Sequence, residues 1–197
     1  ERLTHENSSS CFPSSLRTNT EARSVAVDSA GRSYVGGLFS YTMYLEVTNF
    51  PTAGGQDGFV ASYDANGALR WARRIGGSGP DAVNAMATDA AGNVFVTGFF
   101  SGTADFGGTN LTSAGSYDTF IAKFTPDGAV AWVKRYGDQG LTYGNAIAVD
   151  STGAIALAGS FQNIINFGER CLVGRGADDM FVVRLDANGS LLWAQSG

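Results

Sequence analysis

The chain has 197 residues, of which 44% are hydrophobic, enough for a packed core, and only 16% are charged. Its formal net charge is −5, and basic residues form no cluster larger than an adjacent pair. Nucleic acids and anionic membranes require a basic face, and no apolar run is long enough to span a bilayer. We therefore expect no nucleic-acid partner and no membrane insertion.

The sequence repeats with a period of 61 residues. Three residue types show this period: Trp71, Trp132 and Trp193; Asp57, Asp118 and Asp179; Gly37, Gly98 and Gly159. A constant period of this length means that each copy is one supersecondary unit that packs on its neighbours. We expect a polar segment over 1–14 and units over 15–75, 76–136 and 137–197, together forming one domain of a longer protein.

The polar segment contains the single histidine of the chain, His5. We interpret His5 as part of a polar terminus, because a Ser-His-Asp triad or a histidine-rich metal site cannot be built around it within this chain. Cys11 and Cys171 occupy non-equivalent positions of the repeat. A disulfide between them, which would indicate an oxidising compartment, and two unpaired thiols are both open.

Each unit is predicted to contain four strands, most clearly over 84–89, 94–101, 118–125 and 129–136 of the second unit. Glycine and Asp or Asn residues at the two intervening turns allow the positive φ that hairpins need. Irregular connections rich in small residues are predicted over 41–56, 102–117 and 163–178. No helical periodicity is present, so the chain is expected to be all-β.

The predicted strands are apolar on both faces. In the third strand of the second unit, Phe120, Ala122 and Phe124 form one face and Ile121 begins the other. A sheet wetted on one side alternates more cleanly, so each sheet is expected to lie between two others. This favours an arc of three four-stranded β-propeller blades. A β-trefoil or β-prism is the alternative, because threefold repetition closes those folds.

Two motifs carry a family resemblance: the hairpin Asp-Ala-Asn-Gly followed by Trp, and Val-Thr-Gly-Phe-Phe-Ser-Gly-Thr. With them, residues 22–197 resemble the bacterial seven-bladed beta-propeller-type repeat, common in secreted and surface proteins and lipoproteins. The resemblance implies the propeller fold and a secreted or cell-surface location. It implies no catalytic residues and no cofactor. Three blades cannot close a ring, so further blades or a second chain are expected to complete it.

The acidic motifs have structural interpretations. The stretches 64–67 and 186–189 begin like a calcium loop, but the residues after them supply no further oxygen ligands, so we expect hairpin turns. Asp57, Asp118 and Asp179 are expected to cap turns by accepting backbone N–H bonds. Asp178 and Asp179 form the one adjacent acidic pair considered for a weakly held cation, and we assign no metal site.

Aromatic residues divide into two classes. The three repeated tryptophans are expected to pack between units, since they share one register. Aromatic residues that break the repeat are better ligand candidates: Tyr41, Tyr44, Tyr117 and Tyr143. The connection over 163–178, with Arg170, Cys171 and Arg175, departs most from the other copies, and connections on a rigid scaffold often carry binding.

These observations predict a non-enzymatic binding or display scaffold with a protein or glycan partner. No catalytic, cofactor or metal residue is assigned, and the ligand-binding residues are unknown. The alternatives are a fragment of a propeller enzyme with its active site at the channel mouth, and a purely structural spacer.

Overall fold

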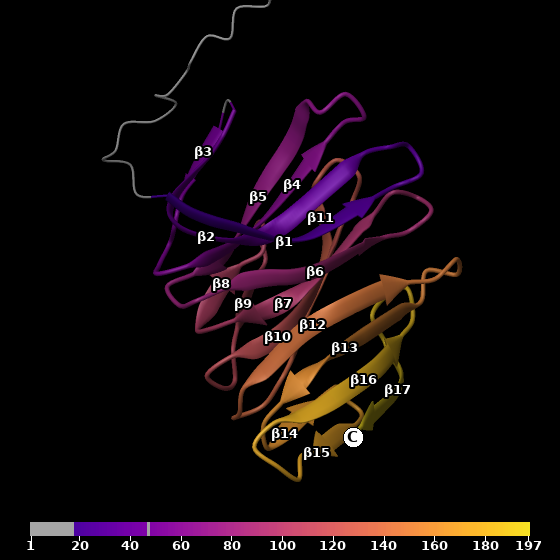
Figure 1. Cartoon of the computed structure of the whole chain (residues 1–197). Coiled ribbons are helices and arrows are strands. Elements are labelled where there is room, and N and C mark those ends of the chain that lie inside the picture. Colours follow the sequence, from indigo (N-terminus) through magenta and orange to yellow (C-terminus); the bar gives the residue numbers. More distant parts are fainter. Residues whose placement is uncertain (1–17, 47) are drawn as a thin grey trace, which may run out of the picture.

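The computed structural model describes residues 18–46 and 48–197, and their regular structure consists of β-strands. Figure 1 shows them as a stack of twisted sheets. The first sheet begins with four strands in the order β1 (Thr18–Val27), β2 (Ser33–Leu45), β4 (Asp57–Tyr63) and β5 (Leu69–Gly77), and three short strands described below extend it to seven. The second sheet has the order β6 (Ala82–Thr88), β7 (Val94–Phe100), β10 (Asp118–Phe124) and β11 (Val130–Tyr136). The third sheet has the order β12 (Thr142–Val149), β13 (Ile155–Phe161), β16 (Asp179–Leu185) and β17 (Leu191–Ser196).

All pairings within these sheets are antiparallel, and the strands expected in the second unit are found close to their predicted bounds. Within the two described ranges, no helix is long and apolar enough to cross a membrane. The fold is therefore all-β and contains several four-stranded antiparallel sheets, as the sequence pattern predicts.

The connections between second and third strands are more ordered than predicted. They contain short hairpin strands: β3 (Thr48–Pro51), β8 (Thr103–Asp105), β9 (Asn110–Thr112), β14 (Ile164–Asn166) and β15 (Cys171–Val173). Runs of three or four residues are too short to show a period of two, which explains why the sequence did not reveal them. β5 extends past residue 75 and pairs with β8 through Gly76 and Gly77, so the hairpin of one unit joins the sheet before it.

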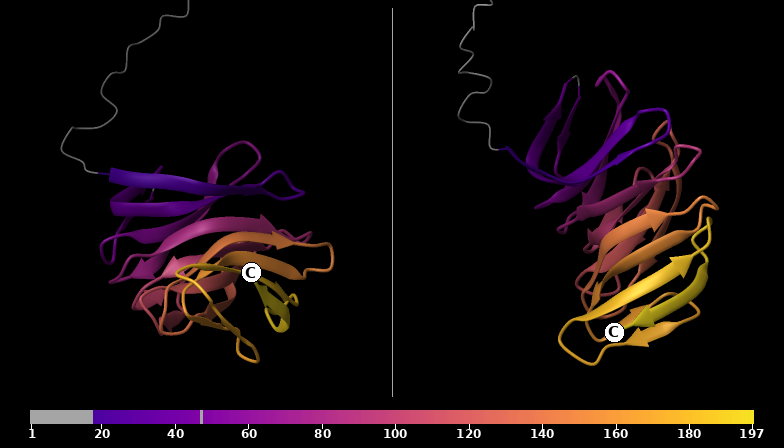
Figure 2. Two further views of the ribbon diagram at one scale, coloured as in Figure 1. Left: turned by 60° about the horizontal axis from the view of Figure 1, so that its bottom comes forward. Right: turned by 45° about the vertical axis from the view of Figure 1, so that its right-hand side comes forward.

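The sheets pack face to face and converge at their first strands (Figure 2). β6 lies between β1 and β12, so the first strand of each sheet contacts the first strand of the next. One apolar cluster joins the first and second sheets and includes Val60, Trp71 and Phe124. Another joins the second and third sheets and includes Ile121 and Leu185. The hydrophobic effect thus acts between sheets as well as within each one.

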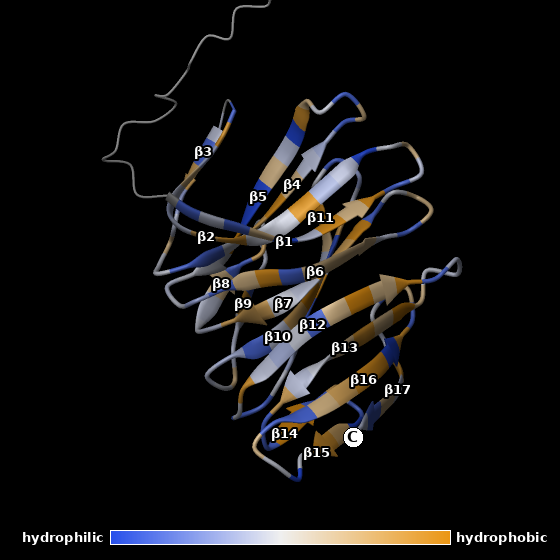
Figure 3. Cartoon of the chain, viewed as in Figure 1, coloured by the Kyte–Doolittle hydropathy of each residue, from blue (hydrophilic) through white to orange (hydrophobic). Residues whose placement is uncertain are grey.

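Burial along the strands follows from this stacking. In β10 every residue but Lys123 is buried, because the second sheet is covered on both faces. In β16 burial alternates from Phe181 to Leu185, as expected for a sheet covered on one face. Figure 3 shows apolar segments recurring along the strands of all three sheets, whereas β5 carries strongly hydrophilic segments.

The repeated glycine of each second strand lies opposite a β-bulge in the first strand. The register of β6 with β7 shifts between Val83 and Ala85, next to Gly98. A Cβ on Gly98 would clash with the carbonyl oxygen of Ala82, so only glycine allows this close approach. The bulge leaves Asn84 unpaired in the ladder and available for contacts with neighbouring sheets.

Candidate functional site

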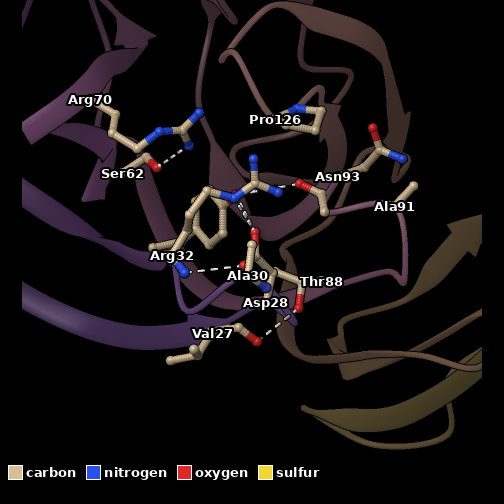
Figure 4. Close-up of polar contacts among 12 residues, drawn as sticks. Val27, Asp28, Ala30, Arg32, Ser62, Arg70, Thr88, Ala91, Asn93 and Pro126 are labelled. Atoms are coloured by element: carbon tan, nitrogen blue, oxygen red, sulfur yellow. Dashed lines mark hydrogen bonds and ion pairs between the residues drawn. The ribbon is translucent and has the colours of Figure 1, made fainter. Parts of the chain in front are cut away.

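The first turn of the first sheet contains a buried carboxylate, Asp28 (Figure 4). It accepts hydrogen bonds from the backbone N–H groups of Ala30 and Arg32, at 2.9 and 3.1 Å, and from the hydroxyl of Tyr34 at 2.9 Å. The Arg32 guanidinium pairs with it at 2.5 Å. Burial alone would raise the pKa of Asp28, but the bonds from Arg32 and Tyr34 lower it. A carboxylate with this many donors fixes the turn and is no free base.

The repeated aspartates before the third strands cap the loops that precede them, as predicted. Asp57 accepts a hydrogen bond from the backbone N–H of Ala53 at 2.8 Å, and Asp118 accepts one from Ala114 at 2.8 Å. Asp179 accepts bonds from Arg175 and Gly176 at 2.9 and 3.1 Å. These carboxylates therefore organise backbone in each unit.

The calcium-like stretches are hairpin turns, as predicted. The Asp64 carboxylate accepts bonds from the backbone N–H groups of Asn66 and Ala68 at 2.8 and 2.9 Å. Asp186 does the same for Asn188 and Ser190 at 2.9 and 2.7 Å. Their oxygens serve the backbone of their own turns, the usual behaviour of an Asx turn.

The three tryptophans do not share one environment. Trp71 is 8% exposed, and its indole N–H donates to the carbonyl of Pro126 in the second sheet at 2.9 Å. Trp132 is half-buried beside Phe95. Trp193 is 46% exposed. Packing between units is confirmed for Trp71, whereas the exposure of Trp193 differs from the prediction because no described sheet follows the third one.

Two of the tyrosines that break the repeat lie together. Tyr117 precedes β10 and Tyr143 lies in β12, and their ring centroids are 5.7 Å apart. Both rings contact Phe99 of β7 edge to face, with centroid distances of 5.3 and 5.2 Å. We call Phe99, Tyr117 and Tyr143 the aromatic triad. All three side chains are partly exposed.

The triad occurs once among the repeats. In the other copies Phe99 aligns with Leu38 and Ser160. Tyr117 aligns with Gln56 and Asp178, and Tyr143 aligns with Ala82 and Glu21. It connects two sheets at the end where β7 finishes and where β10 and β12 begin. The triad lies where the two sheets touch, since β12 packs against both β6 and β7. Sequence reasoning missed Phe99, because it reads as an ordinary strand residue.

The surroundings of the triad are acidic. Burial raises the pKa of Tyr143, and Tyr117 and the Asp178 carboxylate add to that effect. The side-chain amide of Gln162 donates to Asp178 at 3.0 Å. The Asp178 carboxylate, which bonds to Gln162, is therefore close enough to Tyr143 to act on its ionisation.

Comparison with known proteins agrees with this architecture. Residues 70–98, which run from β5 into β7, match the family described as Beta-propeller repeat. Over this stretch the chain is similar to beta-propeller repeats. It is also 26% identical over 157 residues to an uncharacterized WD repeat-containing protein of Acanthamoeba polyphaga mimivirus. That match covers 71% of this chain and 11% of the length of the viral protein.

The remaining candidate residues do not join the triad. Tyr41 and Tyr44 lie in β2 instead of a connection, and both are exposed. Tyr143 likewise belongs to a strand. Cys171 is exposed in β15, whereas His5 and Cys11 lie outside the described residues, so the disulfide stays untested.

Proposed function

We propose that this chain is an arc of three propeller blades that acts as a non-enzymatic binding scaffold for a glycan. The blades would comprise residues 15–75, 76–136 and 137–197, with a polar segment over 1–14 and a repeat of 61 residues. The resemblance to secreted and surface proteins supports an extracellular location for the full protein. Fractionating cells that express the full-length gene tests the location, and a cytoplasmic pool alone would contradict it.

Equivalent strand registers support the three-blade interpretation. Gly37 of β2 pairs with Phe59, Gly98 of β7 pairs with Phe120, and Gly159 of β13 pairs with Phe181. The first strands also bulge at equivalent places. Such repetition of detail is typical of propeller blades that pack around a common axis.

The aromatic triad is the observation on which the binding proposal rests. Tyrosine presents a large rigid face with a polar tip, so it binds a partly apolar ligand at low entropic cost. The C–H face of a sugar ring suits such a platform, and sugar hydroxyls can bond to Asp178 and Gln162. A partly exposed aromatic cluster that does not recur in the other repeats supports a role beyond the packing of blades.

A non-enzymatic role fits the use of the acidic groups. The repeated carboxylates before the third strands accept backbone bonds, and Asp28 is held by Arg32 and Tyr34. General acid–base catalysis needs a titratable group directed at substrate. The acidic group beside the triad, Asp178, is instead oriented by Gln162 as a hydrogen-bond acceptor.

A glycan array probed with the purified chain tests the proposal. We expect binding to a defined set of glycans, and about a tenfold loss of affinity for Tyr117→Ala or Tyr143→Ala, equivalent to roughly 1.4 kcal/mol. Tyr44→Ala is the matched control, because Tyr44 is exposed outside the triad. Equal losses in all three variants, or no binding by the wild type, would refute a glycan site at the triad.

A protein partner is the second candidate, since tyrosine clusters are typical hot spots of protein interfaces. Selection from a displayed peptide library tests this version with the same three variants. Peptides whose binding depends on Tyr117 and Tyr143, in the absence of a glycan ligand, would favour the protein partner.

A further inference from the structure

A cavity lies on the outer side of the gap between the first and second sheets, at the end of β10 opposite to the aromatic triad. It has a volume of about 590 Å³ and is lined mainly by consecutive residues of β5, from Leu69 to Arg73. The other lining residues are Thr48, Phe50 and Asp127, the last from the hairpin between β10 and β11. Two neighbouring sheets of the chain thus enclose this cavity.

Two arginines of this lining, Arg70 and Arg73, are held by neutral hydrogen-bond acceptors. Arg70 donates through Nη1 to the hydroxyl oxygen of the buried Ser62 at 3.1 Å, and Figure 4 shows this bond. Arg73 donates through Nε to the carbonyl of Gly128 and through Nη1 to the carbonyl of Ala72, both at 2.9 Å. These acceptors fix both guanidinium groups without cancelling their positive charges.

The carboxylates of the described residues compensate these two charges weakly. The ion pair of Arg70 is with Asp127, at 3.9 Å, and the Asp127 side chain is 93% exposed. An exposed pair at this distance is worth little, because water screens it. Arg73 takes part in no ion pair within residues 18–46 and 48–197, whereas Nε of the next residue, Arg74, lies 3.5 Å from the buried carboxylate of Asp57. Two cations and one solvated carboxylate therefore line the cavity.

The gap between the second and third sheets shows which part of this arrangement the packing of sheets uses. There Lys134 aligns with Arg73 and donates through Nζ to the carbonyl of Gly189 at 2.8 Å, in the turn equivalent to that of Gly128. The residue that aligns with Arg70 is Ala131. A cation on the glycine turn is thus common to both gaps. Arg70 is an addition that the second gap packs without.

We propose that Arg70 and Arg73 bind an oxyanion, the sulfate, phosphate or carboxylate group of a small acidic ligand. A guanidinium group presents its N–H donors in one plane, and their spacing matches the oxygens of such groups. Within the part of the chain that the structure describes, no hydrogen bond uses Nη2 of either arginine. The bound oxyanion takes the place of Asp127 beside Arg70, and Phe50 provides an apolar contact for the rest of the ligand. This site is separate from the aromatic triad, so it does not rest on the glycan proposal.

Nuclear magnetic resonance titrations of the full chain with inorganic sulfate, inorganic phosphate and acetate test the site, at low ionic strength where screening is weak. The indole N–H of Trp71, which lines the cavity, is the local reporter. We expect a saturable shift of its signal with at least one of the three ions, and the tightest of them identifies the group. Arg70→Gln and Arg73→Gln should each weaken binding about tenfold, since each removes a charged donor. Lys134→Gln, in the other gap, is the matched control and should bind as the wild type does.

Asp127 separates a binding site from an ion pair that only joins two sheets. Asp127→Asn removes the carboxylate that competes with the ligand, so it should tighten binding by about threefold, the size expected for an exposed pair. Arg70→Lys keeps the charge without the planar donors and should bind between the wild type and Arg70→Gln, so the test stands if the glutamine variant does not fold. The proposal is overturned by shifts that do not saturate with any of the three ions, by equal affinities of Arg70→Lys and the wild type, or by weaker binding in Asp127→Asn.

Discussion

The indole of Trp71 lies directly over Gly128 of the next sheet. A Cβ on Gly128 would lie 2.5 Å from Cδ2 of that ring, and the indole N–H donates to the carbonyl of Pro126 two residues earlier. Two features therefore each require glycine at position 128: the indole that covers it, and its φ of +78°.

We predict that Gly128→Ala destabilises the chain more than Gly67→Ala does. Both glycines have positive φ, so both variants pay the cost of a left-handed alanine, roughly 1 kcal/mol. Only at Gly128 does the new methyl meet an indole, which adds about 1–3 kcal/mol of overpacking. Urea unfolding followed by tryptophan fluorescence measures the difference, and equal midpoints would contradict the contact.

Replacing the tryptophans themselves should show their unequal burial. Trp71→Ala empties a buried site between two sheets and should cost about 3–5 kcal/mol in the free energy of unfolding. Trp193→Ala removes an exposed ring and should cost below about 1 kcal/mol when measured at dilute, monomeric concentrations. Thermal unfolding of both variants checks this, and a comparable loss at the two positions would argue against an open third sheet.

Asn84, the bulged residue of β6, connects its own sheet to the first and third sheets. Its side chain accepts a bond from Arg23 at 2.8 Å and donates to the carbonyl of Gly144 at 2.9 Å. Asn84→Ala should lower the free energy of unfolding by about 1–3 kcal/mol, because two bonds between sheets are lost. The control is Asn145→Ala at the equivalent, exposed bulge of β12, which should leave the unfolding midpoint nearly unchanged.

Asp81 is predicted to make stability fall as the pH rises. Burial, with a smaller contribution from the nearby Asp57 carboxylate, raises its pKa to about 7 from 3.8, although the backbone N–H groups of Gly77 and Ser101 bond to it. Below about pH 4 the carboxyl is protonated in both states. From about pH 4 to 7 the unfolded chain releases the proton that the folded chain keeps, so the free energy of unfolding decreases, by up to about 4 kcal/mol.

The variant Asp81→Thr isolates this effect. Threonine stands at the equivalent position, Thr142, where it is buried and hydrogen-bonded. The variant should lose most of the pH dependence between pH 4 and 7 and be more stable than the wild type at pH 8. Parallel pH profiles for the two proteins would show that Asp81 titrates near its ordinary value.

The repeat and the alternation of apolar residues predicted the four main strands of each unit, since both are local properties of the chain. They also predicted the caps at Asp57 and the turns at Asp64, because a carboxylate beside its own loop finds N–H donors there without help from distant residues. The short hairpins, such as β8 with β9, were not predicted. Their stability depends on pairing with Gly76 and Gly77 of the preceding unit, which no local pattern shows.

The candidate site depends on tertiary structure in the same way. The sequence by itself determined that Tyr117 and Tyr143 break the repeat, because that comparison needs only alignment of the copies. The tertiary structure alone decided that they meet each other and Phe99, since the three come from two different sheets that touch where their first strands converge. It also decided the unequal exposure of Trp71 and Trp193. Identical residues at identical repeat positions differ there only because a sheet covers one and no described sheet covers the other.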